Sequence, residues 1–352
     1  MSKFLSQRLL SLAPYVPGEQ PQDKKYIKLN TNENPYPPCK GAFEIMNDTE
    51  AANLKLYSDP ECKLLTKAAS NHFGIKPENI IFGNGSDEIL AFAFTAFCDK
   101  DTGAAFPNIS YGFYKVFAEL NCLDYTEIPL NEDFTINPEN YYNAGKTIFI
   151  ANPNAPTGIM LSVSDIENIL KNNPDNVVVI DEAYVDFGGE SCVPLINKYE
   201  NLLVVQTFSK SRSLAGARLG FGIGCKELID DLQRVRNSNN PYNINRLTQA
   251  MGAASITDFD YFKECTNKII STRTYLTDEL QKRNFAVLSS KTNFVFAKSS
   301  KTKGEDLYLK LKEKGILVRY FNKPIINDYL RITVGTDEEI KSLISAIDEI
   351  EV

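Results

Sequence analysis

Histidine is nearly absent from this chain of 352 residues, which contains only His72. This residue stands shortly before Gly74 in a run that is typical of a helix end, where a cation suits the helix dipole. We therefore predict a structural role for His72. Because Ser-His-Asp hydrolases and histidine-rich metal sites need histidines that the chain lacks, the sequence argues against both, and we expect no metal site.

Closely spaced cysteine pairs are also lacking. The seven cysteines are scattered, odd in number and include no Cys-x-x-Cys pair. This pattern argues against a zinc framework and against a disulfide scaffold. It fits a protein of the reducing cytoplasm, which is the location we expect.

Long basic or apolar runs are missing as well. The net charge is −7 and no cluster of lysine or arginine stands out, which argues against a nucleic-acid partner. The longest strongly apolar stretch, residues 89–98, is about half of the ~20 residues that a membrane span needs, and we interpret it as a core helix. The N-terminus shows no charged start followed by an apolar core, so we expect neither a signal peptide nor a membrane partner.

The feature that carries most chemistry is an apolar run followed by a lysine. Residues 202–205 are all leucine or valine, as in a strand buried on both faces of a parallel sheet, and Lys210 follows. Ligands of open α/β sheets bind where the strands end, and a partly desolvated amine there can form a Schiff base with a carbonyl. Arg218 comes after a small-residue segment and suits a phosphate. The alternative for Lys210 is a solvated loop residue.

Two earlier apolar runs also end in polar clusters. Residues 148–151 lead to an Asn- and Pro-rich turn at 152–158, and residues 177–180 lead to Asp181. Strand and helix signals alternate here, which predicts an α/β fold with a mostly parallel sheet flanked by helices and with its strand ends at one rim. A carboxylate placed after a buried strand needs a cationic or N–H partner. Asp181 is therefore either a ligand-binding group or the cap of the next helix.

A glycine-rich turn, residues 83–88, joins a short predicted strand to the apolar core helix. Its two glycines would let the backbone approach an anion at the helix N-terminus. The turn is neither a dinucleotide fingerprint, because Glu88 stands where that motif needs glycine, nor a P-loop, because Gly-Lys-Ser/Thr is absent. The alternative is an ordinary helix start capped by Ser86 or Asp87.

The two ends of the chain differ from this middle part. Residues 30–38 are rich in Asn and Pro and form either a linker or an irregular loop that lines a cleft. From residue 244 a helical stretch to about residue 280 is followed by shorter strands and helices. We predict a large α/β domain over residues 45–243 and a small α+β domain built from residues 1–44 and 244–352.

At the edge of the sheet where the predicted strands end, a phosphorylated aromatic aldehyde would find a binding partner for each of its functional groups. Its phosphate would lie on the glycine-rich turn and on Arg218, and its ring would stack on Tyr111. Its ring nitrogen would face Asp181, with the phenol of Tyr184 nearby, and its aldehyde would bond to Lys210. Pyridoxal phosphate is such a molecule, so the sequence predicts it as the cofactor.

From residue 29 to residue 336 the chain resembles the fold-type I pyridoxal-phosphate-dependent aminotransferases, and among them the histidinol-phosphate aminotransferase family. The resemblance implies that Lys210 forms the covalent link and shuttles a proton, Asp181 pairs with the ring nitrogen, and Tyr184 bonds to the ring oxygen. It implies a cofactor site made of Tyr57, Ser86, Asp87, Tyr111, Asn154, Asp181, Tyr184, Ser209, Lys210 and Arg218. Tyr57 would reach the cofactor phosphate of a neighbouring subunit, which implies a homodimer.

The resemblance also implies the substrates, histidinol phosphate and glutamate with its product 2-oxoglutarate. Arg331 would take the carboxylate of glutamate. The phosphate of histidinol phosphate would face Arg319, Arg331 and Tyr15, and Asn34 would complete the substrate-binding residues.

One position departs from the family pattern. Ala155 stands where the family usually has an asparagine that donates to the ring oxygen of the cofactor. Asn154 is near enough in sequence to substitute for it. Otherwise Tyr184 carries that hydrogen bond with less help.

Other activities stay open at this point. A decarboxylase acting on a phosphorylated amino acid such as threonine phosphate would share the lysine, aspartate and arginine positions, and an aromatic amino-acid aminotransferase is a nearer alternative. Release of carbon dioxide would identify the former, and activity on phenylalanine or tyrosine the latter. A non-catalytic cofactor-binding protein is the alternative from another class, and the intact Lys210, Asp181 and Arg218 argue against it.

Overall fold

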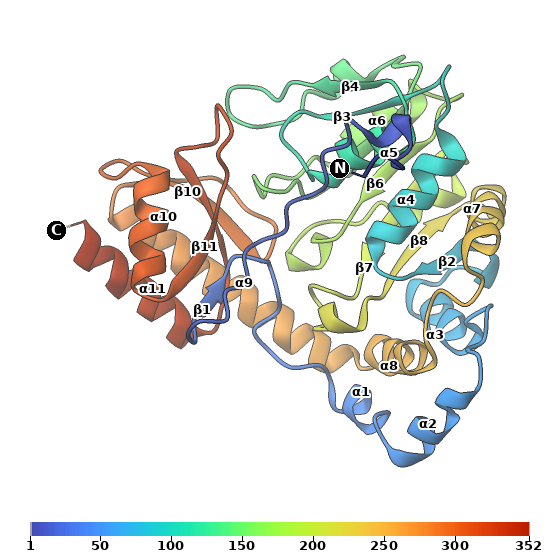
Figure 1. The fold of residues 1–352 in the computed structure, drawn as a ribbon, viewed down its shortest axis with the longest axis horizontal. Coiled ribbons are helices and arrows are strands. Elements are labelled where there is room, and N and C mark those ends of the chain that lie inside the picture. Colours follow the sequence, from blue (N-terminus) through green and yellow to red (C-terminus); the bar gives the residue numbers. More distant parts are fainter. Residues whose placement is uncertain (1, 352) are drawn as a thin grey trace.

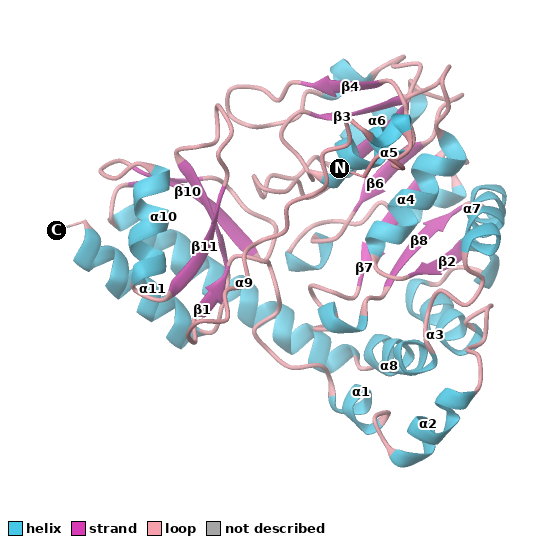
Figure 2. Ribbon diagram, in the orientation of Figure 1, coloured by secondary structure: helices cyan, strands magenta, loops and turns pink. Residues whose placement is uncertain are grey.

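The computed structural model describes residues 2–351, and these contain a large sheet that confirms the predicted α/β fold (Figures 1 and 2). Its strands are β2 Ile80–Gly83, β3 Ala104–Pro107, β4 Tyr125–Ile128, β5 Thr147–Ala151, β6 Val178–Asp181, β7 Leu202–Thr207 and β8 Gly220–Gly224. They are ordered β2-β8-β7-β6-β5-β3-β4. The neighbours are parallel except around β8, which is antiparallel to β2 and β7.

The central strands are buried on both faces because alternate side chains enter two different cores. Val178 packs with one core and Val179 with the other. Helices α3 Lys63–Phe73, α6 Val163–Lys171 and α8 Arg246–Thr257 cover the first face, and α4 Ser86–Phe97, α5 Phe113–Leu120 and α7 Lys226–Asn239 cover the second. This alternation puts Asp181 on the side of α4 and α5.

A second sheet gathers strands from both ends of the chain. Its strands are β1 Ile27–Leu29, β9 Phe285–Val287, β10 Phe294–Ser299, β11 Ile316–Tyr320 and β12 Tyr329–Thr333, ordered β1-β11-β12-β10-β9. β1 runs parallel to β11, so the blue N-terminal segment lies against the red C-terminal part in Figure 1. Helices α9 Phe259–Lys282, α10 Gly304–Glu313 and α11 Asp337–Ile350 supply the rest of this core.

The helical stretch predicted from residue 244 to about 280 is two helices rather than one. Asp258 separates α8 from α9 and caps α9, because its side chain accepts a hydrogen bond from the N–H of Tyr261. Ala253 and Ile256 of α8 join the core under the large sheet. The domain boundaries after residues 44 and 243 stay a prediction, and this packing leads us to propose that the second boundary lies later, at Asp258.

Two short helices, α1 Lys40–Glu44 and α2 Asp48–Ala52, connect the N-terminal segment to α3. Gly74 ends α3 with φ +66°, as the sequence predicted. Burial and the charge of Arg212 lower the pKa of His72, which disfavours its cationic form at this helix end. Nowhere in residues 2–351 does a helix have both the length and the apolar character to cross a bilayer.

Candidate active site

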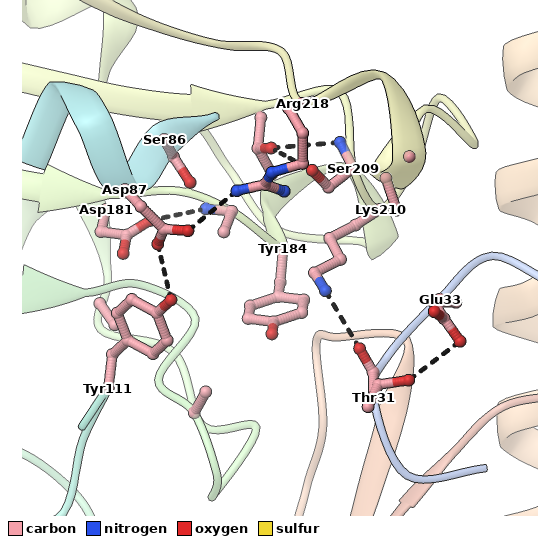
Figure 3. Close-up of a pocket in the computed structure, with 16 residues that line it drawn as sticks. Thr31, Glu33, Ser86, Asp87, Tyr111, Asp181, Tyr184, Ser209, Lys210 and Arg218 are labelled. Atoms are coloured by element: carbon pink, nitrogen blue, oxygen red, sulfur yellow. Dashed lines mark hydrogen bonds and ion pairs between the residues drawn. The ribbon is translucent and has the colours of Figure 1, made fainter. Parts of the chain in front are cut away.

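A cavity of about 330 Å³ lies where β5, β6 and β7 end, as the rim argument predicted (Figure 3). It is lined by most of the side chains predicted for the cofactor, namely Ser86, Asp87, Tyr111, Asp181, Tyr184, Ser209, Lys210 and Arg218. Thr31 and Glu33 of the N-terminal segment line it from another side. Of the two alternatives for residues 30–38, the structure supports the cleft-lining loop.

Lys210 follows β7 and extends into this cavity (Figure 3). Its Nζ donates to the backbone oxygen of Thr31 at 3.2 Å and lies 5.9 Å from the ring centroid of Tyr184. Burial, aided by the charge of Arg331, lowers the pKa of Lys210 to about 8. At pH 7 about a tenth of such an amine is neutral, against less than ~0.1% of a free lysine, so the side chain can act as a nucleophile.

Asp181 ends β6 and is 5% exposed. Its Oδ2 accepts from the hydroxyl of Tyr114 at 3.0 Å, and its Oδ1 accepts from the N–H of Ala183 at 3.2 Å. Burial raises the pKa of Asp181 to about 6, although both hydrogen bonds oppose the rise. A buried carboxyl group that faces a cavity and has neutral hydrogen-bond partners is suited to pair with a cation of a ligand.

The part of the cavity at the start of α4 is suited to an anion. Gly85 has φ +85°, and a Cβ there would lie 2.5 Å from Nη2 of Arg218. Gly85 is also the N-cap of α4, and no side chain caps this helix, so the alternative of a cap from Ser86 or Asp87 is wrong. Arg218 lies 3.0 Å from Asp87, beside the uncapped N–H groups of the helix. This combination of helix N-terminus and guanidinium is a phosphate site in chemical terms.

Two tyrosines near the start of α5 belong to the site: Tyr111 lines the cavity, and Tyr114 is buried beside Asp181. The hydroxyl of Tyr111 donates to Oδ1 of Asp87 at 2.6 Å, which holds its ring at the cavity (Figure 3). Tyr114, which is fully buried and holds Asp181, was missed in the sequence. A second tyrosine so soon after Tyr111 in the sequence is the signal that could have found it.

Two predicted asparagines do not face the cavity. The side chain of Asn154 donates to the oxygen of Ile109 and to Thr157, and it accepts from Ser110. The polar atoms of Asn154 are thus engaged within the turn, and Ala155 lines the cavity instead, so the cofactor role of Asn154 stays a prediction. Asn34 is not among the residues that line the cavity either.

The side-chain amide of Asn34 forms hydrogen bonds with the backbone at Lys210. Its Nδ2 donates to the oxygen of Lys210 at 2.9 Å and to that of Ser211 at 3.3 Å, while its Oδ1 accepts from the N–H of Tyr36. These contacts give Asn34 a structural role, and its substrate-binding role stays a prediction. The N-terminal segment thus fixes the loop that carries Lys210.

The two predicted substrate arginines lie opposite each other on neighbouring strands. Arg319 of β11 and Arg331 of β12 are register partners, so their side chains share one face of the sheet. Arg331 donates to the oxygen of Asn30 at 2.9 Å, and its buried Nε has no partner. Arg319 donates to the oxygens of Val16 and Pro17, both at 3.1 Å. Like charges in this arrangement repel, and a bound anion would offset the repulsion.

The remaining predicted residues, Tyr15 and Tyr57, stay predictions. Tyr15 stacks on Phe113, with ring centroids 4.2 Å apart, and lies 6.2 Å from the ring of Tyr111. Tyr57 is 80% exposed and stacks on Tyr242 at 4.6 Å, outside the cavity of its own chain.

The sequence of this chain is similar to those of known aminotransferases. A family model for class I and II aminotransferases matches residues 24–347. The histidinol-phosphate aminotransferase of Brachyspira hyodysenteriae is 51% identical over 348 residues, which cover 99% of this chain and 98% of that protein. That of Clostridium beijerinckii is 49% identical over 347 residues, covering 99% and 97%.

A solved structure shares the fold. It is the histidinol-phosphate aminotransferase of Sinorhizobium meliloti in complex with pyridoxal 5′-phosphate, with a TM-score of 0.89 and 23% identity, covering 99% of this chain and 98% of that one. The resemblance inferred from the sequence is thereby confirmed. With the family model matched over most of its length and close relatives covering nearly all of it, this chain belongs to the class I and II aminotransferases.

Proposed function

We propose that this chain uses pyridoxal phosphate to exchange amino groups between histidinol phosphate and 2-oxoglutarate, with glutamate as the product or donor. The names of its relatives, at 51% and 49% identity, support this assignment. The structural observation that carries it is the Arg319–Arg331 pair, which lies on one face of the small sheet, with Arg331 near enough for its charge to act on Lys210. Such a pair suits substrates that bring a phosphate or a carboxylate.

The donor set of the cavity fits the cofactor. The uncapped start of α4, Ser209 and Arg218 would hold the phosphate, and the buried carboxyl group of Asp181 would pair with the ring nitrogen. Tyr184 would donate to the ring oxygen, and Lys210 would bond to the aldehyde carbon. A cavity of about 330 Å³ lies within the usual range for small-molecule sites.

Pyridoxal phosphate, when bound, supplies an aldehyde that takes up the amine of the substrate and a ring that withdraws charge from its α-carbon. The chain itself moves the proton: Lys210, with a pKa of about 8, can accept or release one near neutral pH. Asp181 keeps a negative charge at the ring nitrogen and so favours its protonated form. Arg331 would orient the carboxylate of glutamate, and both arginines the phosphate of the other substrate.

An absorbance spectrum of the purified protein from 300 to 500 nm, before and after addition of glutamate, tests this function first. We expect a visible band that moves toward the ultraviolet, and 2-oxoglutarate as the product. Histidinol phosphate with 2-oxoglutarate should then react faster than phenylalanine or tyrosine. A featureless spectrum in the presence of added pyridoxal phosphate would reject the cofactor, and carbon dioxide release without an oxo-acid acceptor would reject transamination in favour of decarboxylation.

Replacing Arg319 by alanine is expected to impair the phosphorylated substrate selectively. Loss of a charged hydrogen-bonding partner costs about 1.5–3 kcal/mol, so KM for histidinol phosphate should rise roughly 10- to 100-fold. KM for glutamate should change by less than about 3-fold, because Arg331 is the guanidinium expected to take its carboxylate. Steady-state kinetics with each substrate varied in turn measure both values.

A neighbouring cation provides the control for Arg319. Lys323 is exposed in the loop after β11, and Lys323→Ala removes one positive charge without removing a register partner of Arg331. It should leave both KM values nearly unchanged. An equal rise in both KM values for Arg319→Ala would show that Arg319 does not discriminate between the substrates.

We also propose a homodimer. The segment around Tyr57 exposes Leu54 and Leu56 by 53% and 54%, which is unusual for residues that face water and suits an interface between copies. Light scattering should then give twice the 39.5 kDa of one chain. Mixing Tyr57→Ala and Lys210→Ala subunits should restore part of the activity if Tyr57 reaches the other subunit, and a fully active monomer would reject the proposal.

The location in the cytoplasm is a proposal as well. All cysteines are free thiols, and most of them, including Cys39 and Cys192, are buried. Free buried thiols persist most readily in a reducing compartment. Recovery of the protein in an extracellular or periplasmic fraction of cells would contradict it.

A further inference from the structure

Asn32 joins the N-terminal segment to the phenol of Tyr184. Its Nδ2 donates to the hydroxyl oxygen of Tyr184 at 2.9 Å. Asn32 is 1% exposed and does not line the cavity, whereas Tyr184 does. The amide therefore reaches the phenol from the interior of the protein and leaves the cavity side of the hydroxyl open.

Every polar group of Asn32 has a partner. Its N–H donates to the hydroxyl oxygen of Thr333 at 3.0 Å, and that hydroxyl donates back to Oδ1 at 3.0 Å. Its backbone oxygen accepts from the side chain of Asn293 at 3.0 Å. Because Oδ1 is engaged by Thr333, the nitrogen end of the amide is the end that faces Tyr184.

The backbone of Asn32 adopts a conformation that few side chains accept. Its φ is +58°, in the left-handed region, where asparagine is tolerated better than most residues other than glycine. Thr333 and Asn293, from the second sheet and the loop before β10, hold this conformation. The placement of the amide against Tyr184 is thus fixed by contacts from a distant part of the chain.

The hydrogen bond has a chemical consequence for Tyr184. Since its oxygen accepts from Asn32, its own hydrogen is available for an acceptor in the cavity, and accepting one hydrogen bond strengthens the donation of another. Burial raises the pKa of Tyr184, while the charge of Arg331 and this hydrogen bond counteract the rise. Ala155, which lines the same cavity, has no side-chain donor to offer.

We propose that Asn32 is a positioning residue that aims the hydroxyl of Tyr184 at the ring oxygen of the cofactor and supplies the support that position 155 does not. The inference rests on the proposed function, because it takes pyridoxal phosphate as the ligand. A donor at the ring oxygen stabilises its negative charge, so it lowers the pH at which the absorbance of the bound cofactor changes. Loss of Asn32 should raise that pH.

Other charges act on the same phenol. Arg331 and Asp181 influence the pKa of Tyr184 in opposite directions, the phenol of Tyr15 adds a smaller influence, and Nζ of Lys210 lies 5.9 Å from its ring centroid. None of these groups changes in the variants below. A difference between wild type and variant therefore reports on Asn32.

Two substitutions test the proposal by spectral titration of the protein loaded with pyridoxal phosphate, without substrate. Asn32→Gly keeps the left-handed backbone and removes only the amide. Asn32→Asp keeps the shape and the acceptor for Thr333, but its second oxygen would take the hydrogen of Tyr184. We expect the apparent pKa of the visible band to rise by about 0.5 units with glycine and by at least as much with aspartate.

A double-mutant cycle separates positioning from a general structural effect. In a Tyr184→Phe background Asn32→Gly should cause no further shift, because the group through which Asn32 acts is gone. Asn30→Ala is the matched control: Asn30 is equally buried, but its side chain donates to the oxygen of Glu19, so the band should titrate as in wild type.

The possible results distinguish a failure of the proposal for Asn32 from a failure of the proposed function. A normal band in wild type with no shift in either Asn32 variant would overturn the inference alone. An equal shift in the presence and absence of the Tyr184 hydroxyl would do the same. Absence of any visible band in wild type loaded with pyridoxal phosphate would overturn the proposed function and this inference together.

Discussion

Replacement of Lys210 by alanine is expected to abolish amino-group exchange and the visible absorbance of the bound cofactor together. The side chain carries the amine whose pKa is lowered to about 8, and no other lysine lines the cavity within residues 2–351. Removing a group that acts both as nucleophile and as proton carrier costs on the order of 10⁶-fold in kcat. A coupled assay for 2-oxoglutarate and a spectrum of the same sample measure both losses.

The control for this substitution is the same change at a lysine outside the cavity. Lys226 begins α7 and pairs with Asp230 on the surface, so Lys226→Ala should retain both turnover and absorbance. Thermal unfolding should show that Lys210→Ala is folded, because the substitution removes a buried amine whose desolvation is unfavourable. Turnover at more than about a hundredth of the wild-type rate would remove Lys210 from its assigned role.

The large sheet and its rim could be predicted because their signals are local. Apolar runs that end in a polar residue, as at Asp181 and before Lys210, locate both the buried strand and its carboxyl end. Parallel connections then bring these ends together without any knowledge of side-chain directions. The family resemblance added the roles of the individual residues.

The roles of the asparagines could not be predicted in this way. Asn154, Asn34 and Asn32 all stand in turn-rich segments, and composition does not tell which atoms their amides meet. The partner of Asn32, Thr333, lies 301 residues away in the sequence. Hydrogen bonds of this kind depend on how the second sheet packs against the N-terminal segment, which periodicity within one segment does not encode.

The division of the helices after residue 243 illustrates the same limit. The periodic apolar residues correctly indicate helix, but they do not tell against which sheet the helix packs. Ile256 of α8 lies in the core under the large sheet, whereas Leu276 of α9 lies in that of the small sheet. The break between them at Asp258 depends on a single capping residue.

Replacement of Asp181 by asparagine is expected to lower kcat by about 10³-fold, or ~4 kcal/mol, while the protein remains folded. The two side chains have nearly the same shape, and an amide oxygen can still accept a hydrogen bond from Tyr114 or Ala183. What is lost is the negative charge that would keep the ring nitrogen of the cofactor protonated. Rapid-mixing kinetics with glutamate measure the loss in a single half-reaction.

The thermal stability of the cofactor-free Asp181→Asn variant, unlike its kcat, should not decrease. The pKa of Asp181 is raised in the folded chain to about 6, so the carboxyl group favours folding at low pH and loses that contribution as pH rises through about 4 to 6. At pH 8 asparagine avoids the burial of a charge, and the cofactor-free variant should melt no lower than wild type.

Tyr114→Phe is the matched control for the loss of kcat, since it removes one hydrogen bond to the carboxylate but not the charge, and kcat should fall by only about 10-fold or less. If Asp181→Asn retained full turnover, or if Tyr114→Phe were equally damaging, the charge of Asp181 would not be the property that the reaction uses.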